Sequence, residues 1–168
     1  MTDLARYIRD IPDFPQPGIL FRDISPLLRS HFRETIDAFA ALFTVDELKS
    51  VDAFAGIDAR GCAFAGGLAQ ALGKGMGMIR KKGKLPPPVH AAEYTLEYGS
   101  ASVEVAPGSG TIIIIDDVLA TGGTLSASAT LCRDAGYSVL GIAVLINLAF
   151  LNRFDWNGMR ARSVITYE

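Results

Sequence analysis

The feature that most constrains this chain is the run from Ile112 to Thr124, in which four isoleucines precede two aspartates and a loop of small residues. Four consecutive β-branched apolar residues predict a short strand buried on both faces, as in a parallel sheet. Asp116 and Asp117 then stand at the carboxyl end of this strand, where open α/β sheets place their ligand crevice. A helical pattern continues from residue 125, so the run predicts a strand, a turn and a helix of an α/β sheet.

The loop of this corner suits a phosphorylated sugar. Backbone N–H groups and the positive end of the helix would cradle a phosphate, and glycines would let the main chain approach it closely. The aspartate pair would bind ribose hydroxyls, or a metal on the same ligand. The alternative is a plain strand–turn–helix corner with a solvated acidic pair. The loop residues are Ala120, Thr121, Gly122, Gly123 and Thr124.

Spacing excludes two other phosphate-binding motifs. A Walker loop ends in Gly-Lys followed by Ser or Thr, whereas Gly73-Lys74 is followed by Gly75. Residues 73–77 imitate a dinucleotide fingerprint, but the third glycine comes one residue early and a helical stretch precedes them. We predict a helix C-cap and turn there.

Composition bounds the class of protein. The 168 residues are 49% hydrophobic and 20% charged, as in an ordinary globular protein, so we expect one domain over residues 1–168. The net charge of −2 argues against a nucleic-acid partner. Cys62 and Cys132 are predicted to be buried thiols, which suits a reducing cytoplasm. His31 and His90 show no metal-ligand spacing with the cysteines, so we expect no structural metal. The sequence has no apolar run of membrane-spanning length and no signal peptide, so we expect no membrane partner.

Alternating apolar segments predict the order of elements. We expect a short helix over residues 3–9, turns over 13–18, a helix capped by Ser30 and carrying Phe32, Ile36, Phe39 and Phe43, strands at 51–57, 76–80, 138–146 and 164–167, and a helix at 61–72. Segments 93–98 and 102–105, joined by residues 99–101, predict a hairpin or a flap over the site, and the proline-rich residues 84–89 exclude a helix or a central strand. The predicted fold class is therefore α/β: a doubly wound, mainly parallel sheet flanked by helices, with a flexible flap.

Two further groups of residues point to an anionic ligand. Arg60 lies in another strand-to-helix corner, residues 56–61, and its planar guanidinium suits a pyrophosphate; the alternative is a surface pair with Asp58. Four cations lie within five residues at the end of the strand predicted at 76–80, where a solvated basic face is the alternative to anion binding. These cations are Arg80, Lys81, Lys82 and Lys84.

The run at 112–124 resembles the phosphoribosyl-pyrophosphate (PRPP) signature of type I phosphoribosyltransferases. Residues 10–28, 56–61, 80–86 and 94–99 are also similar to segments of the adenine phosphoribosyltransferases, and the similarity extends over nearly the whole chain. The runs Phe-Pro-Gln-Pro-Gly-Ile-Leu-Phe and Tyr-Thr-Leu-Glu-Tyr-Gly are the more specific to that branch. Asn147 and Asn152 depart from the family pattern, which often has an acid and a glycine there.

The resemblance implies roles for individual residues. The N-terminal segment would recognise the purine, with Phe21 stacking on the base and main-chain atoms of Leu20 and Arg22 reading its edge. Glu97 would transfer the purine proton from the flap, and Arg60 would assist catalysis by stabilising charge. The implied PRPP-binding residues are Asp116, Asp117, Ala120, Thr121, Gly122, Gly123, Thr124, Arg60, Arg80, Lys81 and Lys84.

The implied reaction joins adenine and PRPP to give AMP and pyrophosphate in purine salvage. Mg²⁺ would be bound chiefly through substrate oxygens, with no firm protein ligand. A homodimer is expected, in which Arg80 and Lys81 of one subunit could serve the neighbouring site. Two alternatives remain open: a phosphoribosyltransferase for another purine, and a non-catalytic PRPP-sensing regulator.

Overall fold

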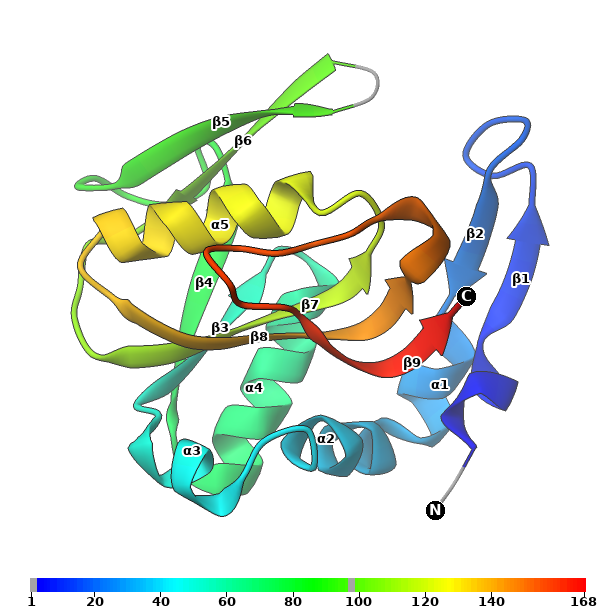
Figure 1. Ribbon diagram of the computed structural model, residues 1–168, viewed down its shortest axis with the longest axis horizontal. Coiled ribbons are helices and arrows are strands. Elements are labelled where there is room, and N and C mark those ends of the chain that lie inside the picture. Colours follow the sequence, from blue (N-terminus) through cyan, green and yellow to red (C-terminus); the bar gives the residue numbers. More distant parts are fainter. Residues whose placement is uncertain (1–2, 97–98) are drawn as a thin grey trace.

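The computed structural model describes residues 3–96 and 99–168. Within that part of the chain, seven strands form one sheet in the order β5-β6-β4-β3-β7-β8-β9 (Figure 1). The central strands β4, β3, β7, β8 and β9 are parallel, and β6 joins β4 antiparallel. The strands are β3 (Ala53–Ile57), β4 (Gly75–Lys81), β5 (His90–Leu96), β6 (Gly99–Val105), β7 (Thr111–Leu119), β8 (Ser138–Leu148) and β9 (Arg162–Tyr167).

Helices cover both faces of this sheet, as the fold prediction required. Figure 1 shows α5 on one face and α2 and α4 on the other, with α1 and α3 beside them. No helix of the described residues is long and apolar enough to cross a membrane. The helices are α1 (Ser25–Ser30), α2 (Phe32–Ala40), α3 (Val45–Ser50), α4 (Arg60–Leu72) and α5 (Gly123–Asp134), and short 3-10 helices cover Leu4–Tyr7 and Ala149–Leu151.

The four isoleucines of β7 explain why the sheet is covered twice. Ile113 and Ile115 belong to the core that contains Phe54 and Phe64 on the α4 side. Ile112 and Ile114 belong to the core on the α5 side. Because successive side chains of a strand point to opposite faces, an unbroken apolar run fills both cores at once. The predicted buried strand is confirmed.

The N-terminal region differs from its prediction. The helix predicted over residues 3–9 is a 3-10 helix that ends at Tyr7, because Arg9 already belongs to β1 (Arg9–Pro12). This strand pairs antiparallel with β2 (Leu20–Asp23), and cross-strand ion pairs join Arg9 to Asp23 and Arg22 to Asp10. The predicted turns over residues 13–18 connect these two strands.

Ser30 does not cap α2, which corrects another prediction. It is the last residue of α1, and its hydroxyl donates to the carbonyl of Pro26 at 2.8 Å. The residue before α2 is His31, and the helix ends at Ala40, before Phe43. Because α1 extends through Ser30, the position before α2 falls to His31, whose side chain makes no capping hydrogen bond.

The other predicted elements are largely confirmed. Strands β3, β4, β8 and β9 and helix α4 match the predicted segments within two residues at each end. Gly73 ends α4 in the left-handed region, as the C-cap prediction stated. Residues 99–101 do not connect the hairpin, because they belong to β6 and pair with residues 94–96 of β5. Both thiols are free; Cys132 is buried as predicted, whereas Cys62 is only half-buried.

Candidate functional site

The acidic pair lies inside β7, near its carboxyl end. The strand continues to Leu119 beyond the predicted end at Ile115, and both aspartates are at least nine-tenths buried. Asp116 Oδ1 accepts a hydrogen bond from the Asp117 backbone N–H at 2.8 Å. Burial, and then the negative charge of Asp117, raise the pKa of Asp116 well above its usual range. The solvated acidic pair considered for this corner is therefore wrong.

Arg60 is the ionic partner of Asp117. Its Nε lies 2.6 Å from Asp117 Oδ2, whereas Asp58 pairs with Arg80 at 3.4 Å. The alternative Asp58–Arg60 surface pair is therefore not formed. The two strand-to-helix corners meet at one edge of the sheet, which is the arrangement that the parallel strands predicted.

Gly61 allows the two corners to approach each other. A Cβ at this position would lie 2.5 Å from the carbonyl oxygen of Ile115 and 3.1 Å from the Cα of Asp116. Such contacts with backbone atoms are too short for any side chain. The absence of a side chain at Gly61 thus lets the start of α4 lie directly against β7 and brings Arg60 to Asp117.

The phosphate loop, residues 120–124, closes the corner at the start of α5. Gly122 has φ +92°, and α5 begins at the next residue, so Gly123 and Thr124 belong to the first helical turn and not to a preceding loop. A small hollow of about 160 Å³ is lined by residues 118–125. Backbone N–H groups of a first helical turn lack intrahelical partners, so this hollow suits an anion.

The β5–β6 hairpin lies over α5 (Figure 1). A Cβ at Gly123 would lie 3.7 Å from the carbonyl oxygen of Thr95 and 4.0 Å from Tyr94 Cδ2. The predicted hairpin therefore reaches the start of the helix beside the phosphate loop. Glu97, the predicted proton-transfer residue, lies outside the described residues.

The basic run leaves the carboxyl end of β4 and turns at residues 82–85. Buried Glu104 holds this turn, because its Oε1 accepts from the backbone N–H groups of Lys84 and Leu85 at 2.9 and 2.7 Å. These hydrogen bonds lower the pKa of Glu104 below its usual range. The Lys81 and Lys84 side chains are exposed, while Arg80 is held by Asp58.

The predicted base-recognition residues lie on β2. The Phe21 ring has the Arg60 guanidinium 5.6 Å from its centroid, and Phe14 meets it edge-on at 5.1 Å. The Arg22 side chain pairs with Asp10 and lies 4.0 Å over the ring of Tyr167. Phe21 and the acidic pair, which are nearly one hundred positions apart, are thus joined through one arginine.

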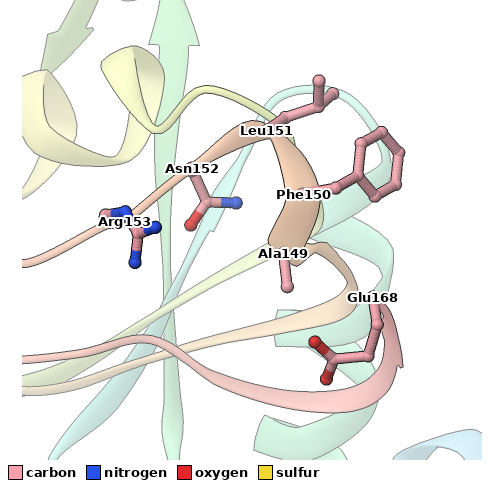
Figure 2. Close-up of a pocket in the computed structure, with 6 residues that line it drawn as sticks. All are labelled: Ala149, Phe150, Leu151, Asn152, Arg153 and Glu168. Atoms are coloured by element: carbon pink, nitrogen blue, oxygen red, sulfur yellow. The ribbon is translucent and has the colours of Figure 1, made fainter.

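A hollow of about 520 Å³ that no sequence motif predicted lies beside the short helix after β8. Figure 2 shows Phe150 and Leu151 projecting from this turn, with the Glu168 carboxylate below Ala149. An adjacent hollow shares Arg153 and extends to Leu119, the last residue of β7. The available signal was two consecutive large apolar residues, 59% and 48% exposed, directly after a strand.

A parallel sheet with a phosphate loop and an acidic pair at one edge is the arrangement of a phosphoribosyltransferase. The family model of the phosphoribosyl transferase domain matches residues 32–152. This match includes both strand-to-helix corners. It does not include the β1–β2 hairpin or β9.

Curated relatives narrow this class. The adenine phosphoribosyltransferase of Bdellovibrio bacteriovorus is 51% identical over 165 residues, which cover 98% of this chain and 99% of the relative. The enzyme of the same name from Hydrogenovibrio crunogenus is 50% identical, over 98% and 96% of the two chains. The chain belongs to the adenine phosphoribosyltransferase family.

Solved structures agree with this assignment. The adenine phosphoribosyltransferase of Rhodothermus marinus is 37% identical with a TM-score of 0.84, over 98% of this chain and 96% of that one. The Saccharomyces cerevisiae enzyme, solved with adenine and an imino-altritol bisphosphate, is 33% identical with a TM-score of 0.84, over 96% and 94%. The predicted fold class and family resemblance are confirmed.

Proposed function

We propose that this chain is a purine salvage enzyme that transfers the 5-phosphoribosyl group from PRPP to adenine. In this reaction the bond from C1′ to the pyrophosphate oxygen breaks, a bond from C1′ to N9 forms, and adenine loses a proton. AMP and pyrophosphate are released. The observation that carries the proposal is the contact of Arg60 with both Asp117 and the Phe21 ring. This contact joins the strand, loop and helix of residues 111–134, which we name the phosphate corner, to the β1–β2 hairpin, which we name the base-recognition segment.

The phosphate corner would bind the ribosyl phosphate. The amides of Ala120, Thr121, Gly122, Gly123 and Thr124 would hold the 5′-phosphate, and Asp116 and Asp117 would bind the ribose hydroxyls. Burial supports this role, since buried carboxylates form strong hydrogen bonds to the hydroxyls they meet. The low dielectric also strengthens the interaction with Arg60.

The departing pyrophosphate would be stabilised by Arg60, Arg80, Lys81 and Lys84. The exposed ammonium groups of Lys81 and Lys84 are available to a substrate, and Glu104 fixes the turn that carries Lys84. Positive charge placed beside the pyrophosphate, where negative charge develops as the bond to C1′ breaks, lowers the barrier of the transfer.

Mg²⁺ would be bound chiefly through PRPP oxygens. The ion keeps several waters and usually takes one or two carboxylates beside substrate phosphates. In residues 3–96 and 99–168 no group of three or more His, Cys, Asp or Glu side chains is placed to hold a metal ion, and Asp117 and Asp58 are paired with Arg60 and Arg80, so the ion would depend on oxygens of PRPP. When bound, Mg²⁺ would supply charge neutralisation on the pyrophosphate.

The base would stack on Phe21, while backbone atoms of Leu20 and Arg22 read its edge. Within the described residues β2 pairs with β1 alone, so one edge of β2 has backbone groups free for a ligand. The Arg22 side chain is engaged by Asp10 and Tyr167, which leaves its main chain for recognition. Glu97 on the flap would handle the proton of the purine.

We also propose a cytoplasmic homodimer. Met76 and Met78 are 40% and 38% exposed on β4, beside an apolar hollow of about 380 Å³. Such a face favours a second copy of the chain, which would bring Arg80 and Lys81 near a neighbouring site. Burial raises the pKa of the Cys132 thiol to about 12, so this cysteine stays protonated and unreactive at neutral pH, which suits a cytoplasmic protein. Light scattering of an active 18.0 kDa species alone would contradict the dimer.

The activity is tested by incubating the protein with PRPP, Mg²⁺ and adenine and measuring AMP and pyrophosphate by chromatography. We expect equal amounts of both products. PRPP binding without turnover of any purine would instead identify a sensor. Turnover of another purine in preference to adenine would keep the reaction class and change the substrate.

A further inference from the structure

The two departures from the family pattern are hydrogen-bonded to each other. Asn152 Nδ2 donates to Asn147 Oδ1 at 3.1 Å and to the carbonyl of Leu148 at 2.8 Å. Asn147 pairs in the sheet with Leu119, the residue directly before the phosphate loop. Figure 2 shows Asn152 pointing to the opposite side of the turn from Leu151. The amide pair therefore ties the chain after β8 to the end of β8, which lies beside the end of β7 where the phosphate loop begins.

The same side chain sets the start of the next segment. Asn152 Oδ1 accepts from the backbone N–H of Phe154 at 3.2 Å. The Phe154 ring lies directly against Gly122, because a Cβ on that glycine would be 2.8 Å from Phe154 Cδ2. Two residues later, Trp156 Nε1 donates to Thr130 Oγ1 of α5 at 3.0 Å. Residues 152–156, which we name the strap, are thus fixed on both sides of the phosphate loop.

We propose that Asn152 is a positioning residue for the phosphate loop and acts through Phe154. Gly122 at φ +92° has no side chain of its own to hold it, and the Phe154 ring supplies the packing on that side. Loss of the Asn152 hydrogen bonds frees the Phe154 backbone, and the ring then moves away from Gly122. Without this packing, the backbone N–H groups of the loop no longer point toward one bound phosphate. This inference rests on the proposed binding of PRPP by the loop.

The test compares variants by calorimetric titration with PRPP and Mg²⁺, by steady-state kinetics and by thermal melting. Asn152→Ala removes all three hydrogen bonds. We expect it to weaken PRPP binding roughly 10-fold, the scale on which outer hydrogen-bond partners of a ligand site act, while the KM for adenine stays within about twofold of wild type. Asn147→Asp retains an acceptor for Asn152 Nδ2, so its PRPP affinity should stay close to wild type.

Thr44→Ala is the matched stability control. It removes the hydrogen bond that the Thr44 hydroxyl accepts from the Glu47 backbone N–H at the start of α3, and α3 lies on the other face of the sheet from α5 (Figure 1). We expect Thr44→Ala to lower the melting temperature about as much as Asn152→Ala does and to leave the PRPP affinity unchanged. This result would show that lost stability alone does not weaken PRPP binding.

Two results would overturn the proposal. One is unchanged PRPP affinity in Asn152→Ala; the other is an equal loss of PRPP and adenine affinity in Asn152→Ala and Thr44→Ala. Asp116→Asn with Asp117→Asn separates this failure from a failure of the site. If that double variant loses PRPP binding while Asn152→Ala does not, the strap has no positioning role and the proposed site stands.

Discussion

The phosphate corner and the base-recognition segment are built by opposite means. The corner, residues 111–134, is contiguous in sequence, and its aspartates are buried between two apolar cores. The β1–β2 hairpin is mostly exposed, with Leu20 at 47%, and is held by ion pairs and by Tyr167 from the far end of the chain. PRPP binding should therefore depend on backbone geometry fixed by the core, and adenine binding on polar contacts between distant segments. Substitutions in the two regions should separate the two affinities.

The largest effect is expected from Asp116→Asn combined with Asp117→Asn. A hydrogen bond to Asp117, which is ion-paired with Arg60, is worth about 1.5–3 kcal/mol, and one to Asp116, whose pKa is raised, is worth about 0.5–1.5 kcal/mol; the loss of both should weaken PRPP binding roughly 300-fold. Adenine binding should change far less, because Phe21 remains in place. Calorimetric titration measures the PRPP affinity. An unchanged value would remove both residues from the sugar site.

Gly122→Val should weaken PRPP binding about 100-fold, the cost of misplacing ligand-binding groups by about an ångström. A β-branched side chain at φ +92° is strained, and its Cβ would overlap the Phe154 ring. Gly158→Val is the matched control, because Gly158 has φ +84° and open space around it. Equal PRPP affinities in the two variants would mean that the anion lies elsewhere.

Phe21→Ala should raise the KM for adenine about 10-fold, since stacking of a base on an aromatic ring is worth about 1–3 kcal/mol. The PRPP affinity should stay near wild type. Initial rates at saturating PRPP measure the effect. Phe14→Ala, which removes the edge-on neighbour and leaves the Phe21 face, should have a smaller effect. A larger loss in Phe14→Ala would move the stacking role away from Phe21.

Tyr167→Ala should raise the KM for adenine roughly fivefold, because a cation–π contact to the partly buried Arg22 side chain is worth about 1 kcal/mol. This variant tests the support that the C-terminal strand gives to Arg22. Tyr167→Phe keeps the ring and should behave as wild type in the same kinetic assay. If both variants lose the same amount, the hydroxyl and not the ring would be responsible.

The smallest effect on ligands is expected from Glu47→Gln, which should change stability alone. Hydrogen bonds from Arg162 lower the pKa of Glu47 from 4.5 to about 2. A carboxyl whose folded pKa is lowered stabilises the protein above its unfolded pKa and loses that contribution as pH falls toward the folded value. The difference in melting temperature between wild type and variant should shrink from pH 6 to pH 2.5. A constant difference would contradict the ion pair with Arg162.

The corner could be predicted from sequence because its causes are local. Four isoleucines, two acids and a glycine loop lie in one run, and each residue type has a direct conformational or chemical consequence. The approach of Arg60 followed from one further rule, that carboxyl ends of parallel strands share an edge. The acids lie inside a longer strand because β8 continues to pair with β7 up to Leu119.

The base-recognition segment was recognised only by resemblance, because its structure depends on distant residues. Residue 9 joins a strand because Asp23 and Arg22 pair across to Arg9 and Asp10. The link from Arg22 to Tyr167 spans almost the whole chain, and no periodicity encodes it. The strap was missed for the same reason: Asn147 and Asn152 appear as two separate departures in sequence and as one hydrogen-bonded pair in the fold.

Backbone atoms of Leu20 and Arg22 are proposed to select adenine by its 6-amino group. The most direct test is the ratio of kcat/KM for adenine and hypoxanthine, measured with wild-type protein, PRPP and Mg²⁺. A backbone carbonyl that accepts from the amino group would oppose the 6-oxo group of hypoxanthine. Because the bound base would cover this carbonyl, such a mismatch supports a preference of roughly 10⁴-fold. We predict a preference for adenine of that order. Equal kcat/KM values for adenine and hypoxanthine would contradict selection of the 6-amino group by the backbone of Leu20 and Arg22.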